Sequence, residues 1–172
     1  MKLFLLTVSL FLCSITNAAT YYISPTGNDV TGNGSITNPW RTLFKATQTV
    51  TTFGDKIRVL AGTYTETQTC ILSTGVSIEG DAAATTIIRA DETGAWSSLL
   101  QLDSPDGTNA TQSISKVTLD GQFVSSTNFK TWVAIWVTGR SNVSIHDCII
   151  KNFKQSGVIL TGINENNPGT DA

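Results

Sequence analysis

The sequence predicts an all-β fold, a right-handed parallel β-helix of about three and a half coils with a short N-terminal capping helix. Between Thr131 and Leu160, four apolar runs too short for helices and rich in Val and Ile are separated by turn-forming residues. The runs that end at Val137 and Leu160 lie 23 residues apart, which is a period typical of solenoids. One strand-and-turn pattern also recurs at Gly75–Gly80, Lys116–Gly121 and Asn142–Asp147.

The first eighteen residues have the pattern of a secretory signal peptide. Lys2 supplies the positive charge, Leu3–Leu12 the apolar run, and Ala18 the small residue before the cleavage site, with Ala19 as the alternative. We therefore expect export, to the extracellular space or the cell surface, and a mature domain of residues 19–172. Cys13 leaves lipid modification as a second possibility. The rest of the sequence contains no apolar run of membrane-spanning length.

The charge of the chain argues against a nucleic-acid partner. The sequence has 11 basic and 13 acidic residues and a formal net charge of −2, which becomes −3 when Lys2 leaves with the signal. Proteins that bind nucleic acid need clustered Lys and Arg, which this sequence does not have. Only 14% of the residues are charged, and Ser, Thr, Asn and Gly supply most of the polar positions. We expect a monomer.

The N-terminal part of the mature chain predicts a cap for the solenoid. Tyr21–Ser24 is expected to form a strand, followed by a loop and by a helix over about residues 39–52 that Pro39 begins. Positions on one face of this helix are Leu43, Ala46, Thr47 and Val50. An uncovered end of a solenoid is an edge for pairing, so we expect this helix to cover it.

The same segment carries a resemblance to a known superfamily. The residues that carry it are Tyr21–Asp29, Asn38–Leu43, Lys45-Ala46, Gly54-Asp55 and Ala61–Tyr64. In this order they resemble the opening segment of secreted right-handed parallel β-helix proteins of the pectate-lyase-like superfamily. The resemblance implies the fold and a polysaccharide ligand. It leaves the activity open, because lyases, hydrolases, epimerases and non-catalytic surface proteins share this segment.

The apolar runs can be arranged in three columns of stacked strands. The first column is expected to hold Ile57–Leu60, Thr86–Ile88, Gln122–Val124 and Cys148–Ile150. The second is expected to hold Cys70–Leu72, Leu99–Leu102, Val133–Val137 and Val158–Leu160. The third is expected to hold Val76–Ile78, Val117–Leu119 and Val143–Ile145. Because side chains alternate along a strand, Val133, Ile135 and Val137 should face the core.

Three further expectations follow from this arrangement. Residues 103–113 are expected to form an exposed insertion loop, because they are rich in Gly, Pro, Asp and Thr. The last coil ends without a recognisable cap, so we expect a C-terminally incomplete fragment of a longer β-helix. Cys70 and Cys148 fall on different columns, and we expect them to remain unpaired because bridged Cα atoms lie within about 7 Å of each other.

The third column suggests a cation site. Its outward positions place Glu79, Asp120 and His146 on successive coils, with Asp147 at the same corner. Stacked carboxylates about 4.8 Å apart repel each other unless a cation or a proton lies between them. The candidate calcium ligands are therefore Glu79, Asp120 and Asp147, although Ca²⁺ requires six or more oxygen ligands. The alternative is a set of solvated turns.

The remaining candidates concern a polysaccharide ligand. Trp132 and Trp136 should point outward from one strand, where indole rings can stack on sugar rings, unless another part of the chain covers them. Candidate catalytic residues for a β-eliminating lyase are Lys151, Arg140 and His146. We therefore expect a secreted protein that binds or cleaves acidic polysaccharide. A glycoside hydrolase is the second enzymatic possibility, and a non-catalytic adhesin or structural module is the rival.

Overall fold

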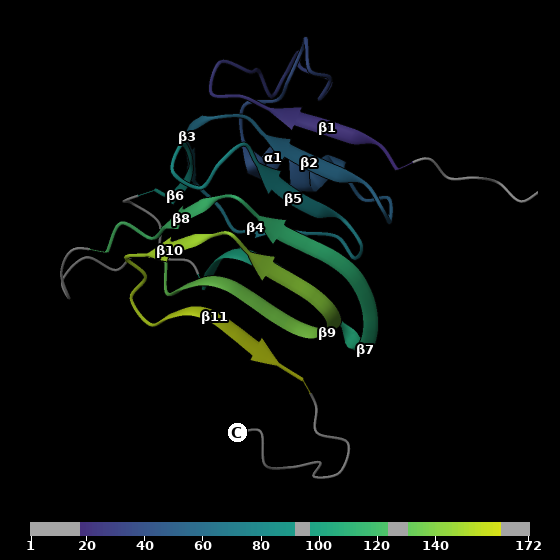
Figure 1. The fold of residues 1–172 in the computed structure, drawn as a ribbon, viewed down its shortest axis with the longest axis vertical. Helices are drawn as coiled ribbons and strands as arrows, with labels where there is room; N and C mark the ends of the chain where they lie inside the picture. Colours follow the sequence, from purple (N-terminus) through teal and green to yellow (C-terminus); the bar gives the residue numbers. More distant parts are fainter. Residues whose placement is uncertain (1–17, 92–96, 124–130, 163–172) are drawn as a thin grey trace, which may run out of the picture.

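The structure, a computed structural model, describes residues 18–91, 97–123 and 131–162. It has one short helix, α1 (Leu43–Thr49), and otherwise β-strands that stack along one axis (Figure 1). The strands of the N-terminal half are β1 (Thr20–Ile23), β2 (Lys56–Val59), β3 (Gly62–Glu66), β4 (Cys70–Ile71), β5 (Ser77–Gly80) and β6 (Thr86–Ala90). Those of the C-terminal half are β7 (Ser98–Ser115), β8 (Thr118–Asp120), β9 (Val133–His146), β10 (Ile149–Lys151) and β11 (Ser156–Thr161).

Two parallel sheets make up the solenoid. The larger sheet runs in the order β1-β2-β5-β7-β9-β11, with β4 also paired to β7, and the smaller runs in the order β10-β8-β6-β3. All of these strand pairs are parallel. This confirms the all-β parallel β-helix. Within the described residues, no helix is long and apolar enough to cross a membrane. The expected signal peptide lies almost entirely outside the described residues.

Each coil contributes one segment to each of three rows. Row 1 consists of β2, β5 and the segments 112–115 and 143–146, and β1 pairs with β2 at its N-terminal end. Row 2 consists of β3, β6, β8 and β10. Row 3 consists of β4, the segments 98–103 and 133–138, and β11. Strands β7 and β9 are long because each continues from row 3 into row 1 around a corner, as their curved ribbons show (Figure 1).

The expected columns were right for row 3 and wrong elsewhere. Row 3 stacks Cys70 on Leu100, Leu100 on Ile135, and Ile135 on Val158, as the second column required. The first and third columns mixed rows 1 and 2. Row 1 contains Ile57, Ile78, Ile114 and Ile145.

The segment Val117–Leu119 was the main error of the expected columns. Thr118 and Leu119 pair with Ile87 and Ile88 in row 2, so this segment does not stack on Val76–Ile78. The apolar–polar alternation is the same in rows 1 and 2, and only a sharp turn separates them. That turn contains Lys116 (φ 58°) and is repeated one coil later at Asp147 (φ 54°).

The expected insertion loop at 103–113 is instead part of strand β7. The extra residues are accommodated as irregularities in the pairing of β7 with β9, between Asp103 and Thr108 and again between Asn109 and Gln112. Gly107 and Thr111 adopt positive φ angles of 77° and 42° within this stretch. The turn-rich composition therefore marks the corner between rows 3 and 1 and not an excursion from the sheet.

The core lies inside the coils and follows the alternation of side chains. Val133, Ile135 and Val137 are at most 2% exposed, which confirms their expected orientation. Other fully buried residues are Ile23, Leu43, Ile57, Leu72, Ile78, Ile88, Leu99, Leu100, Leu102, Ile114 and Leu119. Cys70 is buried, Cys148 is half-buried, and both are free thiols, as expected.

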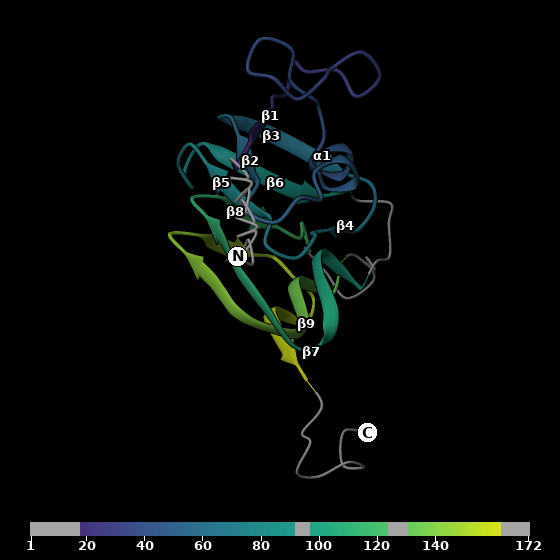
Figure 2. The ribbon, with the colours of Figure 1, turned by 90° about the vertical axis from the view of Figure 1, so that its right-hand side faces the viewer.

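Helix α1 covers the side of the stack near β1, β3 and β4, and Figure 2 shows it on the same side of the molecule as β4. It is shorter than the expected helix over residues 39–52. The hydroxyl of Thr42 accepts a hydrogen bond from the Lys45 N–H (3.1 Å) and caps the helix. Before the cap, Trp40 forms a bridge to Ile23.

The carboxylate of Glu66 also stabilises the start of α1. It is 1% exposed and accepts hydrogen bonds from the backbone N–H groups of Leu43 (2.8 Å) and Phe44 (3.0 Å). Burial raises the pKa of Glu66, although these two N–H groups act in the opposite direction. A side chain from row 2 thus holds the capping helix on the coil stack.

Candidate functional site

Trp132 and Trp136 lie at the start of β9 and point outward. Trp132 immediately precedes the strand and is 42% exposed, and Trp136 is half-buried. Their Cα atoms are about 13 Å apart along an extended chain. The Trp132 carbonyl accepts hydrogen bonds from the N–H groups of Gln155 (2.9 Å) and Ser156 (3.2 Å), which fixes the backbone below this ring. Both side chains point outward because side chains alternate along the strand. The sequence predicted this row of strands correctly.

An open, apolar hollow of about 430 Å³ lies between the two indole rings. Its lining consists of Ser97, Trp132, Val133, Trp136 and Gln155. The rings are held from different directions. The Trp136 Nε1–H donates to the Thr161 hydroxyl at 3.2 Å, and the Trp132 ring is covered on one face by the Lys154 ammonium group at 4.5 Å from the centroid. The hollow thus combines two aromatic faces with one nearby positive charge.

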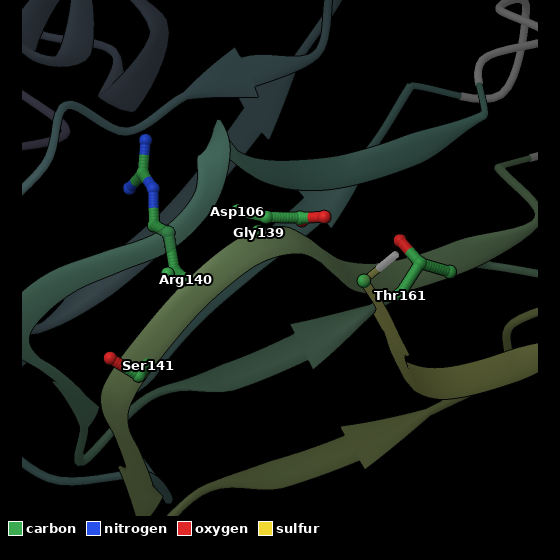
Figure 3. Close-up of a pocket in the computed structure, with 7 residues that line it drawn as sticks. Asp106, Gly139, Arg140, Ser141 and Thr161 are labelled. Carbon is green, nitrogen blue, oxygen red and sulfur yellow. The ribbon is translucent and has the colours of Figure 1, made fainter. Parts of the chain in front are cut away.

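A second hollow, of about 350 Å³, lies at the corner where β9 passes from row 3 to row 1. Figure 3 shows the side chains of Asp106 and Thr161 facing each other across it, whereas Arg140 and Ser141 point away. Thr161 links the two hollows, because its hydroxyl also accepts the Trp136 hydrogen bond.

Arg140, a candidate catalytic residue, has a structural environment. Its guanidinium donates to the Ser104 hydroxyl (2.8 Å), the Gln112 side-chain oxygen (3.0 Å) and the Asp103 carbonyl (2.8 Å). Burial lowers the pKa of Arg140, and the charge of Asp103 partly opposes this. These three bonds join β9 to β7 at the corner, so Arg140 stabilises the bend.

The candidate calcium ligands do not come together. Glu79 lies in row 1, where its outward neighbours along the row are Arg58 and Ser115, followed by His146. Asp120 lies in row 2, where it pairs with Arg89 and Lys151. The expected stacking of Glu79 on Asp120 is therefore wrong. Among the described residues, no group of three or more His, Cys, Asp or Glu side chains could hold a metal ion.

Glu79 is instead the centre of an ion-pair cluster. Its carboxylate lies 2.8 Å from Lys56 Nζ, 2.8 Å from the Arg58 guanidinium and 2.9 Å from Lys116 Nζ. Arg58 also contacts Asp81 at 2.8 Å. Hydrogen bonds from Lys56 and Lys116 lower the pKa of Glu79 to about 2. The carboxylate that was expected to bind a cation is thus neutralised by three side chains.

Lys151 and Asp120 form a separate pair in row 2. The Lys151 Nζ lies 3.6 Å from Asp120 Oδ2, and the Asn152 amide donates to Asp120 Oδ1 at 2.9 Å. Burial alone would raise the pKa of Asp120. The Asn152 amide, the Gln122 N–H and the Lys151 charge outweigh it and lower the pKa.

His146 contacts its neighbour Asp147, with 2.9 Å between Nδ1 and Oδ2, and both side chains are exposed. His146 lies in row 1, Arg140 at the corner between rows 3 and 1, and Lys151 in row 2. The three candidate catalytic residues therefore occupy three separate sites. Gln155 and Ser97 line the aromatic hollow and Lys154 lies against the Trp132 ring, although no local motif marks these three residues.

The fold and this surface define the molecule as a parallel β-helix with an exposed aromatic face. Residues 25–171 match the family described as "Protein of unknown function (DUF1565)", and the chain belongs to this family. Among solved structures it is similar to a pectin methylesterase mutant in complex with a hexasaccharide, with a TM-score of 0.51 and 15% sequence identity. The similarity covers 83% of this chain and 49% of that chain.

At this sequence identity the structural similarity shows the fold alone. The chain spans about half the length of that structural neighbour. No curated protein matches the sequence.

Proposed function

We propose that the protein is exported and binds an acidic polysaccharide through Trp132 and Trp136 on β9. The observation that carries the proposal is the apolar hollow of about 430 Å³ between the two rings. The faces of sugar rings carry C–H groups that pack against indole, and a rigid aromatic side chain loses little conformational entropy when it binds. Two rings on one strand suit a chain of sugars better than a single small molecule.

The acidic character of the ligand is inferred from Lys154. Its ammonium group lies against the Trp132 ring, so a sugar stacked on the exposed part of this ring could place a carboxylate close to it. The resemblance to pectate-lyase-like proteins and the structural similarity to a pectin methylesterase support uronate polymers as the first ligands to test.

The test is calorimetric titration with polygalacturonate, methyl-esterified pectin and a neutral glucan. We expect binding to polygalacturonate, and a loss of at least about tenfold in affinity for Trp132→Ala and for Trp136→Ala, since buried aromatic contacts are worth about 2 kcal/mol. The matched control is Phe53→Ala, because Phe53 is 56% exposed and does not line the hollow. Unchanged affinity in both tryptophan variants would contradict the proposal.

A non-catalytic binding module is favoured over a lyase by the separation of Lys151, Arg140 and His146. β-Elimination needs a base and a neutralising cation at the same sugar residue, and these three candidates belong to three different sites. Incubation with pectate, alginate and glycosaminoglycans should therefore yield no unsaturated, ultraviolet-absorbing ends. Their appearance would identify a lyase, and new reducing ends without unsaturation would identify a hydrolase.

A further inference from the structure

The strand β3 is the N-terminal edge of the smaller sheet. It pairs with β6 and lies above β6, β8 and β10 in Figure 1. The Gly62 N–H donates to the Thr85 carbonyl (2.7 Å), so Gly62 directs this group toward β6. Because alternate residues of a parallel strand direct their backbone groups to opposite sides, those of Thr63 and Thr65 point away from β6. Among the described residues, no hydrogen-bond partner is found for these two N–H groups.

A polar cleft of about 240 Å³ lies along this edge. The side chains of Arg41, Thr63 and Thr65 are exposed. Within the part of the chain that the structure describes, neither the Arg41 guanidinium nor these two hydroxyl groups form a hydrogen bond. The cleft thus has one positive charge and two hydroxyl groups available to a ligand. Its lining consists of Pro25, Arg41, Thr42, Thr63, Tyr64 and Thr65.

The segment that supplies Arg41 and Thr42 is held in place by Asp29. The Asp29 carboxylate accepts hydrogen bonds from the Arg41 N–H (2.7 Å), the Thr42 N–H (3.1 Å) and the Thr42 hydroxyl (2.8 Å). These three donors compensate the negative charge of Asp29. The Arg41 guanidinium is therefore free to bind an anionic group, and the cleft needs little rearrangement before a ligand enters.

Both ends of this strand edge are covered, which restricts what can bind. A Cβ added at Gly62 would collide with the Pro25 ring, so Pro25 packs directly on the start of β3. At the other end, the Glu66 carboxylate accepts the N–H groups of Leu43 and Phe44, which places the start of α1 there. A peptide that adds to a sheet as a new strand needs a longer free edge than the one between these contacts. The cleft therefore suits a small molecule.

We propose that this cleft is a second binding site, for one hexuronate residue, either a free sugar acid or the end of an acidic polysaccharide. The Arg41 guanidinium can bind the carboxylate through charge-assisted hydrogen bonds. The hydroxyl and N–H groups of Thr63 and Thr65 can bind the ring hydroxyls. The cleft is smaller than the roughly 300–1,000 Å³ of sites for drug-sized ligands, which suits a single ring.

The cleft is separate from the aromatic hollow. It lies at β3 in row 2, whereas Trp132 and Trp136 belong to row 3. The residues that precede the described part of the chain enter elsewhere, because Ala19 is hydrogen-bonded to Asp55 and Lys56 at the start of β2. The inference therefore does not rest on the proposed function of the tryptophans, and the two sites can be tested independently.

Titration of the ¹⁵N-labelled exported chain with galacturonate, followed by amide chemical shifts, tests the proposal. We expect galacturonate to shift the amide resonances of Thr63 and Thr65 and to bind about tenfold more tightly than galactose, which lacks the carboxylate. Arg41→Gln should remove this preference and leave the affinity for galactose unchanged. Lys45→Gln is the matched control. It also removes one positive charge, but Lys45 lies on α1 and does not line the cleft, so the preference should remain.

Three results would overturn the proposal. They are a galacturonate titration that shifts neither threonine amide, an Arg41→Gln variant that keeps the preference, and inorganic phosphate that binds as tightly as galacturonate. Trp132→Ala should leave binding in the cleft unchanged, so failure of this site and failure of the tryptophan surface can be distinguished.

Trigalacturonate distinguishes the two sources of the ligand. If the trimer shifts the amide resonances of Thr63 and Thr65 as the monomer does, the cleft binds the end of a polymer. If only the monomer shifts them, the cleft binds a free sugar acid.

Discussion

Two glutamates, Glu66 and Glu79, have opposite environments that follow from which face of a strand each occupies. Glu66 shares the inward face of β3 with Tyr64, and burial there raises the pKa of Glu66. Glu79 lies outward on β5, where Lys56 and Lys116 lower its pKa to about 2. The two carboxylates should therefore affect stability with opposite pH dependence.

Glu79→Gln should destabilise the fold at neutral pH by about 1 kcal/mol, because it removes the carboxylate that holds three cations together. The pKa of Glu79 in the folded state is depressed, so its contribution is present above the usual pKa of a glutamate and is lost as the pH falls toward about 2. Urea unfolding of wild type and variant should thus differ at neutral pH and converge in acid. Asp147→Asn, at an exposed turn, is the control and should change stability little.

Glu66→Ala should cost about 3 kcal/mol, because the N–H groups of Leu43 and Phe44 would lose their acceptor inside the protein. Thr65→Ala is the matched control. Thr65 is adjacent in β3 but points outward and is exposed, so its loss should cost less than about 0.5 kcal/mol. Equal unfolding free energies for the two variants would show that Glu66 does not hold α1.

The residues of the aromatic hollow differ in how far the sequence reveals them. Trp132 and Trp136 can be predicted, because period-two alternation beside Val133, Ile135 and Val137 fixes their side of the strand. Lys154 and Gln155 cannot be predicted, because the first reaches the Trp132 ring and the second the hollow through a turn whose conformation is held by the Trp132 carbonyl. The same limit applies to Glu79, whose three partners come from β2 and from the turn before β8.

At the scale of elements, the strands are predictable and their stacking is only partly so. Row 3 has long apolar segments that differ from the others, and its stacking is read correctly from the sequence. Rows 1 and 2 share one alternating pattern, and the first turn between them has a positive φ at Lys116, a residue type with no strong turn preference. When the strands are arranged by sequence pattern alone, segments of rows 1 and 2 are therefore placed in the same column. Residues 103–113 are assigned to a loop, although they belong to β7.

The corner between rows 3 and 1 gives a test of this reinterpretation. Gly139 has a φ of 68°, and a Cβ at this position would collide with the Ser104 carbonyl oxygen of β7. Gly139→Ala should therefore cost about 3 kcal/mol, from backbone strain and close packing together.

Gly107→Ala is the matched control for this prediction. Gly107 has a φ of 77°, but nothing lies within 4 Å of the Cβ it would gain, so only the strain of about 1 kcal/mol applies. Thermal unfolding of both variants measures the difference. Equal losses would mean that β7 and β9 do not pack this closely at the corner.

At the scale of the whole molecule, the described coils run from β1 to β11 in the larger sheet and from β3 to β10 in the smaller one. The sequence predicted that a helix would cover the N-terminal end, whereas the backbone of β1 is hydrogen-bonded by Gly34 and Trp40, which precede α1. Leu160 of β11 pairs with Val137 of β9 and has the same inward register, but Leu160 is 74% exposed whereas Val137 is 2% exposed. A pattern of residues shows that a side chain faces inward, but only the assembled coils show whether anything covers it.

The N-terminal end also sets a direction for folding. Synthesis produces the residues of β1, its covering loop and α1 first, and these can be fixed in place as soon as β2 and Glu66 of β3 have followed. Each later coil adds mainly to the coil just completed, so the order of synthesis matches the order in which stacking partners become available. The chain can therefore fold progressively from its capped end, and only the most recently formed coil presents a reactive edge at any moment.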